Sequence, residues 1–358
     1  MAGPPVLMPF PSYPTRTREN PYTDLLYRHL VDAGVRVLPD DRIWFRAFLG
    51  RPDVPPDFVH YHWPGRRYTS RVGPLSPARA AWFFGRLDLM RLRGVQIVWT
   101  MHNELPHERA WDAFDGWARR RMVATSDLIL VNFLAAADLL RERYGRTAGV
   151  YHVPHGSYRG HYPDELGRAA ARARLGIAGD AFVFLAFGDI RAYKSIADAI
   201  EAFRHIDAPS ARLLIAGRPK SREAVREAVR MVKSDARILV HARAVRDEEV
   251  QVYFRTADAL LIGRRAFSSG AAVLGLDFGL PIVGFAENHV GEIARGAALI
   301  PIEEEGRAGF SRAMRAALAM DVEVARRDAV ASSDALAWPP IAARLAEILR
   351  ENLRRGSE

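Results

Sequence analysis

Reactive side chains follow the apolar segment Gln96–Met101, which we predict to be a β-strand. His102, Asn103 and Glu104 come next, so an imidazole, an amide and a carboxylate are adjacent. Because an imidazole or a carboxylate can take a proton from a hydroxyl group, this segment is predicted to supply a general base. The alternative is that His102 only hydrogen-bonds the backbone of its own loop.

Two further histidines lie on the predicted strand Phe58–His62. His60 and His62 are two residues apart and therefore share one face of that strand. Histidines can ligate a metal ion, but no carboxylate stands at a useful spacing, and we predict no metal site. His62 is a second candidate base beside His102.

A glycine turn with two cations follows the predicted strand Phe182–Phe187. Gly188 lets the backbone pass close to a ligand, and Arg191 and Lys194 precede the predicted helix Ser195–Phe203. A guanidinium and an ammonium group beside a helix N-terminus are suited to a diphosphate. The alternative is that both are solvated surface cations.

A third polar segment comprises Ser268, Ser269, Gly270 and Ala271, and it opens a predicted helix that ends at Phe278. Small residues let backbone N–H groups and serine hydroxyls surround phosphate oxygens at a helix N-terminus. A plain serine N-cap would use the same residues, and the two roles are compatible.

The elements that must position these groups alternate between short apolar strands and amphipathic helices, as in α/β proteins with parallel sheets. We predict two Rossmann-like domains, 1–160 and 161–335, that face a cleft and bind ligands at the carboxyl ends of their strands. A C-terminal helix within 336–358 can cross back to the first domain. The predicted strands are Val6–Met8, Val35–Leu38, Phe58–His62, Gln96–Met101, Leu128–Asn132, Gly149–Val153, Phe182–Phe187, Arg212–Ala216, Ile238–Val240, Ala259–Ile262, Pro281–Gly284 and Ala298–Pro301. The main predicted helices are Tyr22–Ala33, Trp111–Val123, Ala135–Tyr144, 164–175, Ser195–Phe203, Ser221–Val232, Asp247–Thr256, Gly270–Phe278 and Ile341–Leu353.

The composition excludes several classes of protein. The 358 residues are 49% hydrophobic and 26% charged, which is typical of a folded globular chain. No apolar run approaches the ~20 residues that span a bilayer, and the proline-rich start lacks the basic region of a signal peptide. With no cysteine, disulfides, thiolate metal sites and thiol nucleophiles are excluded, and we expect a cytoplasmic protein. No dinucleotide fingerprint, Walker A sequence or nucleophile elbow occurs.

The formal net charge is +9, and most of the cations are arginines. Nucleic acid, an anionic membrane surface and a phosphorylated ligand are the partners that such a charge favours. No nucleic-acid-binding motif accompanies it, so we expect no nucleic-acid partner. A solvated basic surface is the simpler alternative.

In their order along the chain, these segments resemble the motifs of GT-B-fold glycosyltransferases of the group 1 type, which use a nucleotide-sugar donor. The turn from Gly188 to Lys194 resembles the turn whose arginine and lysine bind the donor diphosphate, with Arg191 in place of an arginine at position 189. Thr100–Asn103 resembles the strand end whose histidine approaches the transferred sugar. Val153–Gly156 resembles the hinge before the second domain. Other segments that resemble family motifs are Leu213–Gly217, the helix from Asp247 to the pair Ala257-Asp258, and Leu276–Val283. Residues 20–22 and 58–64 resemble segments of a bacterial subgroup of the family that builds polysaccharides.

The resemblance implies transfer of a sugar from a UDP- or GDP-linked donor to a hydroxyl of a sugar or lipid-linked saccharide, without a cofactor or a metal. The implied catalytic residues are His102, Asn103, Glu104 and His62, and the acceptor would lie near Asn20, His62 and Trp63. The implied donor-binding residues are Gly188, Arg191, Lys194, Arg243, Ser268, Ser269, Gly270 and Ala271.

One departure from the family pattern concerns stereochemistry. Retaining members carry two glutamates around the donor loop, and Ala266 and Leu274 stand at those positions here. Neither side chain can accept a hydrogen bond as a carboxylate does. Inversion with a histidine or Glu104 as base, and retention with the diphosphate oxygen as base, therefore both stay open.

Two other functions share this architecture. A nucleotide-sugar 2-epimerase would isomerise or split the donor without any acceptor, and a non-catalytic protein would only bind the nucleotide sugar. If the acceptor is lipid-linked, first-domain arginines would favour peripheral docking at the inner face of the membrane. These are Arg16, Arg18, Arg66, Arg67 and Arg71.

Overall fold

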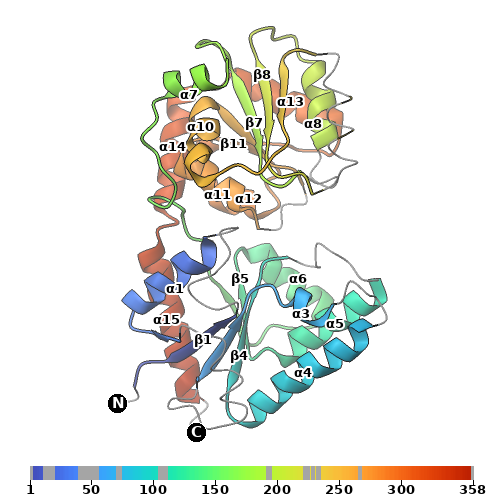
Figure 1. Ribbon diagram of the computed structural model, residues 1–358, viewed down its shortest axis with the longest axis vertical. Helices are drawn as coiled ribbons and strands as arrows, with labels where there is room; N and C mark the ends of the chain where they lie inside the picture. Colours follow the sequence, from blue (N-terminus) through green and yellow to red (C-terminus); the bar gives the residue numbers. More distant parts are fainter. Residues whose placement is uncertain are drawn as a thin grey trace. The chain divides into compact units, whose positions relative to one another are not determined.

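A computed structural model describes residues 3–10, 21–38, 56–69, 75–103, 112–190, 196–220, 226, 230, 235–264 and 268–355 of the chain. The chain divides into two compact units. The first unit comprises Met1–Gly156 with Ala337–Glu358, and the second comprises Ser157–Leu336. Each unit is built on a six-stranded parallel sheet with helices, which confirms the predicted α/β class (Figure 1).

The sheet of the first unit has the strand order β2-β1-β3-β4-β5-β6. The chain order reverses between β1 and β3, and a ligand site of such a sheet forms at the carboxyl ends of the two strands that flank this switch point. The strands are β1 (Val6–Phe10), β2 (Arg36–Val37), β3 (Phe58–Tyr61), β4 (Gln96–Met101), β5 (Leu128–Val131) and β6 (Val150–His152).

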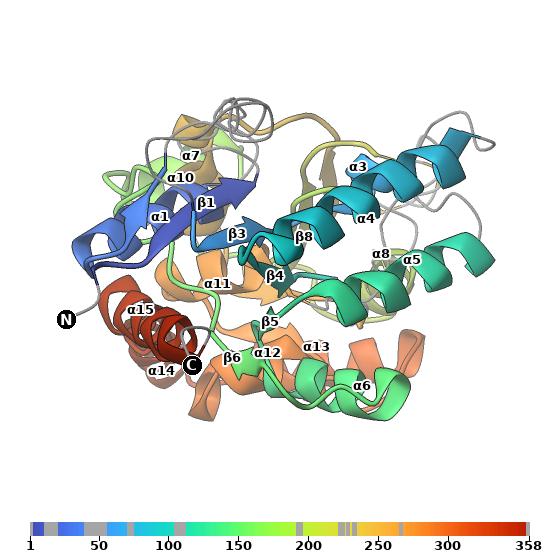
Figure 2. The ribbon, with the colours of Figure 1, turned by 90° about the horizontal axis from the view of Figure 1, so that it is seen from below.

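Helices from both ends of the chain pack together in the first unit. Helix α1 (Tyr22–Asp32) lies beside α15 (Trp338–Arg355), as Figures 1 and 2 show. Nη2 of Arg350 donates to the carbonyl of Ala33 at 2.6 Å. The C-terminal helix therefore crosses back to the first unit, as predicted. The other helices of this unit are α3 (Gly65–Tyr68), α4 (Ser76–Leu92), α5 (Asp112–Thr125) and α6 (Leu134–Tyr144).

The sheet of the second unit has the order β12-β11-β10-β7-β8-β9, so its switch point lies between β7 and β10. Helices α8 and α13 pack together over one face, where Phe184, Phe203 and Phe310 are fully buried. The strands are β7 (Val183–Phe187), β8 (Arg212–Ala216), β9 (Ile238–His241), β10 (Ala259–Leu261), β11 (Ile282–Gly284) and β12 (Leu299–Pro301). The helices are α7 (Arg168–Arg174), α8 (Ile196–Arg204), α10 (Asp247–Thr256), α11 (Gly270–Asp277), α12 (His289–Ile293), α13 (Arg307–Leu318) and α14 (Val322–Asp334).

The structure differs from the predicted helices in several places. Helices α3, α4, α12, α13 and α14 were not predicted, and the helix expected over 164–175 is confined to Arg168–Arg174. Asp164 lies before this helix and pairs with Arg255 instead. The predicted helix Ser221–Val232 lies almost wholly outside the described residues.

Asp258 holds the amino ends of the strands of the second unit together. Its carboxylate accepts hydrogen bonds from Arg172 at 2.8 Å, from Arg168 at 2.5 Å and from the N–H of Val183 at 2.9 Å. Arg172 is only 2% exposed, so this is a buried ion pair. Asp258 directly precedes β10 and is therefore at the edge opposite to the carboxyl ends of the strands.

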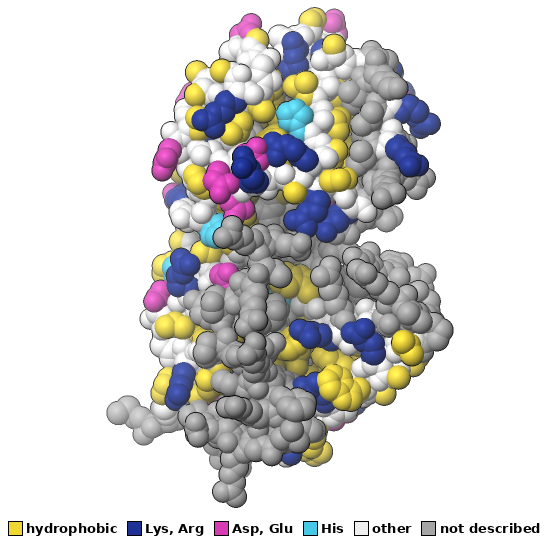
Figure 3. Space-filling model, in the orientation of Figure 1, with side chains coloured by type: hydrophobic (Ala, Val, Ile, Leu, Met, Phe, Trp, Pro, Cys, Tyr) yellow, Lys and Arg dark blue, Asp and Glu magenta, His cyan; other side chains and the backbone are white. Residues whose placement is uncertain are grey.

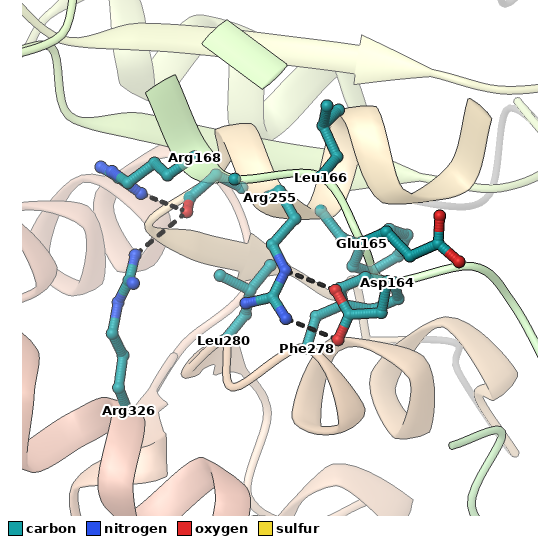
Figure 4. A pocket seen from close by; sticks show the side chains of 11 residues that line it. Asp164, Glu165, Leu166, Arg168, Arg255, Phe278, Leu280 and Arg326 are labelled. Carbon is teal, nitrogen blue, oxygen red and sulfur yellow. Dashed lines mark hydrogen bonds and ion pairs between the residues drawn. The ribbon is translucent and has the colours of Figure 1, made fainter. Parts of the chain in front are cut away.

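A pocket of about 280 Å³ opens beside this cluster (Figure 4). Arg168 and Arg326 both donate to the carbonyl of Ala257, and Arg255 forms a bidentate pair with Asp164 at 2.5 Å. These arginines are occupied by protein partners. We therefore assign the pocket to the structural edge of the sheet.

Candidate functional site

Strands β3 and β4 bring the reactive histidines of the first unit to one place. The two strands pair in parallel, with His60 opposite Val98. Because side chains alternate along a strand, His60, His62, Thr100 and His102 all lie on the same face. Helix α1 covers that face with Tyr22 and Tyr27.

Hydrogen bonds join five of these side chains in one line, which we call the histidine–tyrosine chain: Thr100, His60, Tyr27, His62 and His102. Nε2 of His60 lies 2.7 Å from Oγ1 of Thr100, and Nδ1 of His60 lies 3.1 Å from the hydroxyl of Tyr27. The same hydroxyl lies 2.7 Å from Nε2 of His62. Nδ1 of His62 lies 3.0 Å from Nε2 of His102, which ends the line.

Aromatic rings enclose His102. Trp63 stacks on its imidazole with a centroid distance of 4.5 Å, and Tyr22 meets it edge-on at 5.0 Å. Tyr22 also contacts His155, in the segment predicted to form the hinge, at 4.5 Å. A side chain at Gly156 would collide with the indole of Trp338, because its Cβ would lie 2.3 Å from that ring. The glycine is thus required for this close packing.

Burial keeps all four of these histidines neutral. It lowers the pKa of His60 to about 3 and that of His155 to about 4, because a charged imidazole cannot be solvated there. It lowers the pKa of His62 and of His102 well below the ordinary value, and the neighbouring histidines add to the effect. Each ring therefore carries one N–H and one lone pair at neutral pH, so His102 is in the state that a general base requires.

Two glycines meet at the carboxyl edge of the second unit, next to its switch point. Gly188 follows β7 with φ +108°, and Gly217 follows β8 with φ +146°. A Cβ on Gly217 would lie 1.8 Å from the carbonyl oxygen of Gly188, so only glycine fits. The N–H of Ile190 donates to the carbonyl of Arg218 at 2.8 Å, which fixes the turn from which Arg191 and Lys194 follow.

The start of α11 lies after β10, on the other side of the switch point. Oγ of Ser269 accepts from the N–H of Ala272 at 3.2 Å, and the N–H of Ser269 donates to Nδ1 of His289 at 3.3 Å. Oγ of Ser268 is buried without a hydrogen-bond partner among the residues that the structure describes. A Cβ on Gly270 would lie 2.7 Å from the hydroxyl of Tyr158. The segment is therefore a capped helix start with one serine hydroxyl still available.

Comparison with known proteins relates this architecture to sugar transfer. No protein-family model matches the chain. A GDP-mannose:glycolipid 4-beta-D-mannosyltransferase of Xanthomonas campestris is 25% identical over 287 residues, which are 79% of this chain and 74% of that protein. A second protein of that name and species is 28% identical over 222 residues, 61% of this chain and 56% of its own length.

Solved structures agree with the sequence relatives. Sucrose-phosphate synthase of Thermosynechococcus elongatus has a TM-score of 0.72 at 17% identity, over 98% of this chain and 100% of that one. Anabaena HepE in complex with UDP and glucose has a TM-score of 0.66 at 14% identity, over 97% and 100%. The chain is a glycosyltransferase with the GT-B fold.

The structure places the predicted acceptor-side residues of this glycosyltransferase as follows. His62 and His102 are in direct contact, and Asn103 is half-buried beside them in the chain. Glu104 and Asn20 lie outside the described residues. Sequence reasoning missed the contributions of Tyr27 and Thr100, although the apolar spacing in Tyr22–Ala33 already marked a buried helix face.

The predicted donor-side residues of the glycosyltransferase are only partly described. Gly188 directly follows β7, Ser268 and Ser269 directly precede α11, and Gly270 and Ala271 begin that helix, which is the next one after β10 in the chain. Arg191, Lys194 and Ala266 lie outside the described residues, and Leu274 is buried in α11. The diphosphate-binding role of these groups stays a prediction.

Arg243, the remaining donor-side candidate, is engaged by its own neighbours. Its guanidinium forms two hydrogen bonds to Glu249, at 2.8 and 2.7 Å, and one to the hydroxyl of Tyr253 at 3.3 Å. The bonds from Arg243, together with those from Arg246, lower the pKa of Glu249 to about 2. A nucleotide would have to share Arg243 with Glu249, and its contact with the donor stays a prediction.

Two further features bear on cofactors and membranes. Among the described residues of the glycosyltransferase, no group of three or more His, Asp or Glu side chains could hold a metal ion. No helix within those residues combines the length and the apolar character needed to cross a membrane.

The buried histidines predict acid sensitivity of the first unit. In the unfolded chain a histidine imidazole binds a proton below about pH 6.5, whereas the imidazole of His155 in the folded unit stays neutral down to about pH 4. The contribution of His155 to the free energy of unfolding is therefore fully present above the pKa that its imidazole has in the unfolded chain. It is lost as the pH falls toward the pKa in the folded unit, by about 3 kcal/mol for a shift of this size. Tryptophan fluorescence during urea unfolding should show a lower midpoint at about pH 5 than at about pH 7.5.

The tryptophans make this measurement specific, because all seven lie in the first unit. His205→Gln, at an exposed position of the second unit, should leave the pH dependence unchanged. Equal midpoints at the two pH values would contradict the burial of neutral histidines. The tryptophans are Trp44, Trp63, Trp82, Trp99, Trp111, Trp117 and Trp338.

Proposed function

We propose that the protein transfers a mannosyl group from GDP-mannose to a hydroxyl of a glycolipid, with inversion at the anomeric carbon. The two mannosyltransferases to which the chain is similar support the donor and the acceptor class. The observation that carries the stereochemical part is the neutral, buried His102 at the end of β4. An inverting displacement needs such a base on the acceptor side.

In this reaction the acceptor oxygen attacks the anomeric carbon and forms the new glycosidic bond. The bond between that carbon and the diphosphate oxygen breaks, and GDP leaves with its electron pair. His102 takes the proton of the acceptor hydroxyl. Arg191 and Lys194 stabilise the charge on the leaving diphosphate, together with the N–H groups at the start of α11.

Product analysis with a panel of donors tests this function. Incubation with GDP-mannose, other GDP-sugars and UDP-sugars should give a glycolipid product only with a GDP-linked donor, and NMR should show the inverted anomer. An isomerised donor or a free sugar formed without any acceptor would indicate the epimerase alternative, which the comparisons do not support. A product formed from UDP-sugars alone would contradict the proposed donor.

Lys194→Ala should weaken the binding of GDP by about one to two decades in Kd. The variant lacks one charge-assisted hydrogen bond, which contributes ~1.5 to 3 kcal/mol. Calorimetric titration measures this change directly. Arg312→Ala, which removes an exposed cation of α13, is the matched control and should bind GDP normally. Equal affinities of wild type and Lys194→Ala would place the diphosphate elsewhere.

The glycolipid acceptor requires access to a membrane, and we propose that α4 and α5 supply the contact. Trp82 on α4 is 64% exposed, and Trp117 on α5 is 44% exposed. The guanidinium of Arg86 lies 4.1 Å from the ring centre of Trp82. In Figure 3 the surface over α3, α4 and α5 combines hydrophobic and basic side chains. Exposed indole rings beside arginines suit the headgroup region of an anionic bilayer.

Most of the arginines predicted from the sequence to dock on the membrane lie outside the described residues. Arg16, Arg18 and Arg71 lie outside the described residues, and the side chain of Arg66 is not described either. Arg67 is exposed and lies over the ring of Phe10 at 4.2 Å.

Replacing both Trp82 and Trp117 by Ala should reduce binding to anionic vesicles by at least about tenfold, because two large apolar side chains no longer enter the bilayer. Sedimentation with phosphatidylglycerol-containing vesicles at low and moderate salt measures the bound fraction. Val330→Ala removes an exposed apolar side chain from the second unit and should bind like the wild type. Absence of wild-type binding at low salt would contradict the membrane proposal.

A further inference from the structure

The histidine–tyrosine chain restricts where protons can sit. His60 and His62 use both ring nitrogens within it, and Tyr27 links the two with a single hydroxyl. His102 uses only Nε2, and within the described part of the chain no hydrogen bond reaches its Nδ1. Whether Nδ1 of His102 carries a proton therefore depends on where the protons sit on the other residues of the histidine–tyrosine chain.

Only two arrangements make all four contacts hydrogen bonds, since each neutral imidazole has one N–H and the hydroxyl of Tyr27 has one proton. In the first, Tyr27 donates to His62, which then donates from Nδ1 to His102, and Nδ1 of His102 must carry the proton. In the second, Tyr27 donates to His60, and Nε2 of His62 donates to Tyr27. Nε2 of His102 then donates to His62, which leaves a lone pair on Nδ1 of His102.

We propose that Tyr27 is a positioning residue that, together with Thr100, holds His102 in the second arrangement. This inference rests on the proposed function, in which His102 takes the acceptor proton; because Nε2 is bonded to His62, we assign that step to Nδ1. Only the second arrangement leaves a lone pair on Nδ1 of His102, and in it Thr100 accepts from Nε2 of His60 at 2.7 Å, whereas in the first arrangement Thr100 would donate.

The surroundings of His102 favour such indirect control. The described rings that contact its imidazole are His62, Trp63 and Tyr22, and each of these is an uncharged ring. Tyr22 and Tyr27 keep their protons, because burial raises the pKa of Tyr22 to about 12 and that of Tyr27 well above its ordinary value. No charge within this group of rings competes with the hydrogen bonds in setting the tautomer.

Nitrogen NMR of protein labelled with 15N-histidine tests the proposal without any need for activity. His102→Gln assigns the His102 signals. In the wild type, Nε2 of His102 should have the shift of a protonated nitrogen and Nδ1 that of an unprotonated one. In Tyr27→Phe and in Thr100→Val the two signals should move toward each other, because both tautomers become populated.

Matched variants separate this effect from a general disturbance of packing. Tyr61→Phe removes a hydroxyl from an equally buried tyrosine of β3 whose ring lies against Phe10 and Phe83. Thr100→Ser keeps the hydroxyl that Thr100→Val removes. Both Tyr61→Phe and Thr100→Ser should keep the wild-type His102 signals.

The kinetic expectation is a lower kcat for Tyr27→Phe and Thr100→Val, by about fivefold, with an unchanged KM for the donor. Wild-type His102 signals that are already averaged, or that stay the same in Tyr27→Phe, would overturn the proposal, as would an equal change in Tyr61→Phe. The NMR result holds whether or not GDP-mannose is the donor. A failure of the proposed function is therefore distinguishable from a failure of this inference.

Discussion

His102→Gln is expected to lower kcat by about 10²- to 10⁴-fold, the range that a positioned general base contributes. Glutamine keeps a polar side chain of similar reach but cannot take the proton of the acceptor hydroxyl. Because His102 takes the proton in the transition state and does not bind GDP, the Kd of GDP should stay unchanged. Single-turnover rates and calorimetric titration of the same preparation measure the two quantities.

The pH dependence of the same reaction gives an independent check. Burial holds the pKa of His102 well below its ordinary value, so the base stays unprotonated and kcat should be level between about pH 8 and about pH 6. His152→Gln, at an exposed position on β6, is the control and should keep wild-type rates. A His102→Gln variant with wild-type kcat would assign proton removal to another group.

Asp258→Asn is expected to destabilise the second unit by roughly 3 to 5 kcal/mol, as for a broken buried ion pair. Asparagine has nearly the volume of aspartate but leaves the buried guanidinium of Arg172 without its counter-charge. Urea unfolding followed by far-UV circular dichroism should show an earlier transition. Tryptophan fluorescence, which reports on the first unit, should keep its midpoint.

Asp164→Asn is the matched control for this prediction, because the pair between Asp164 and Arg255 is partly exposed and is expected to contribute less than about 1 kcal/mol. If Asp258→Asn and Asp164→Asn shift the unfolding transition equally, the buried cluster does not stabilise the unit as argued.

The parts of the fold that depend on local pattern were predictable from the sequence. Short apolar runs predict the strands, and His102 and Gly188 directly follow the carboxyl ends of β4 and β7, as expected from the polar residues after those runs. Helix α4 was missed because a buried pair, Phe83 and Phe84, stands beside exposed Trp82, which obscures its amphipathic pattern.

The parts that depend on strand pairing were not predictable. The contact between His62 and His102 requires the register of β3 against β4, and Tyr27 joins them only because α1 covers that face. The pair Ala257-Asp258 resembles the family pair that precedes the donor loop, and this resemblance gives Asp258 no role of its own. The structure shows that Asp258 binds arginines at the amino ends of the strands, a role that no spacing along the chain reveals.

The return of α15 to the first unit has a consequence for the order of synthesis. The second unit, Ser157–Leu336, is continuous in the chain, whereas the first unit needs segments from both sides of it. During translation the second unit can fold as soon as it is made, but the first unit is complete only when α15 has been made and packs beside α1. A ribosome that stops before residue 337 would therefore release a complete second unit attached to an unfinished first one.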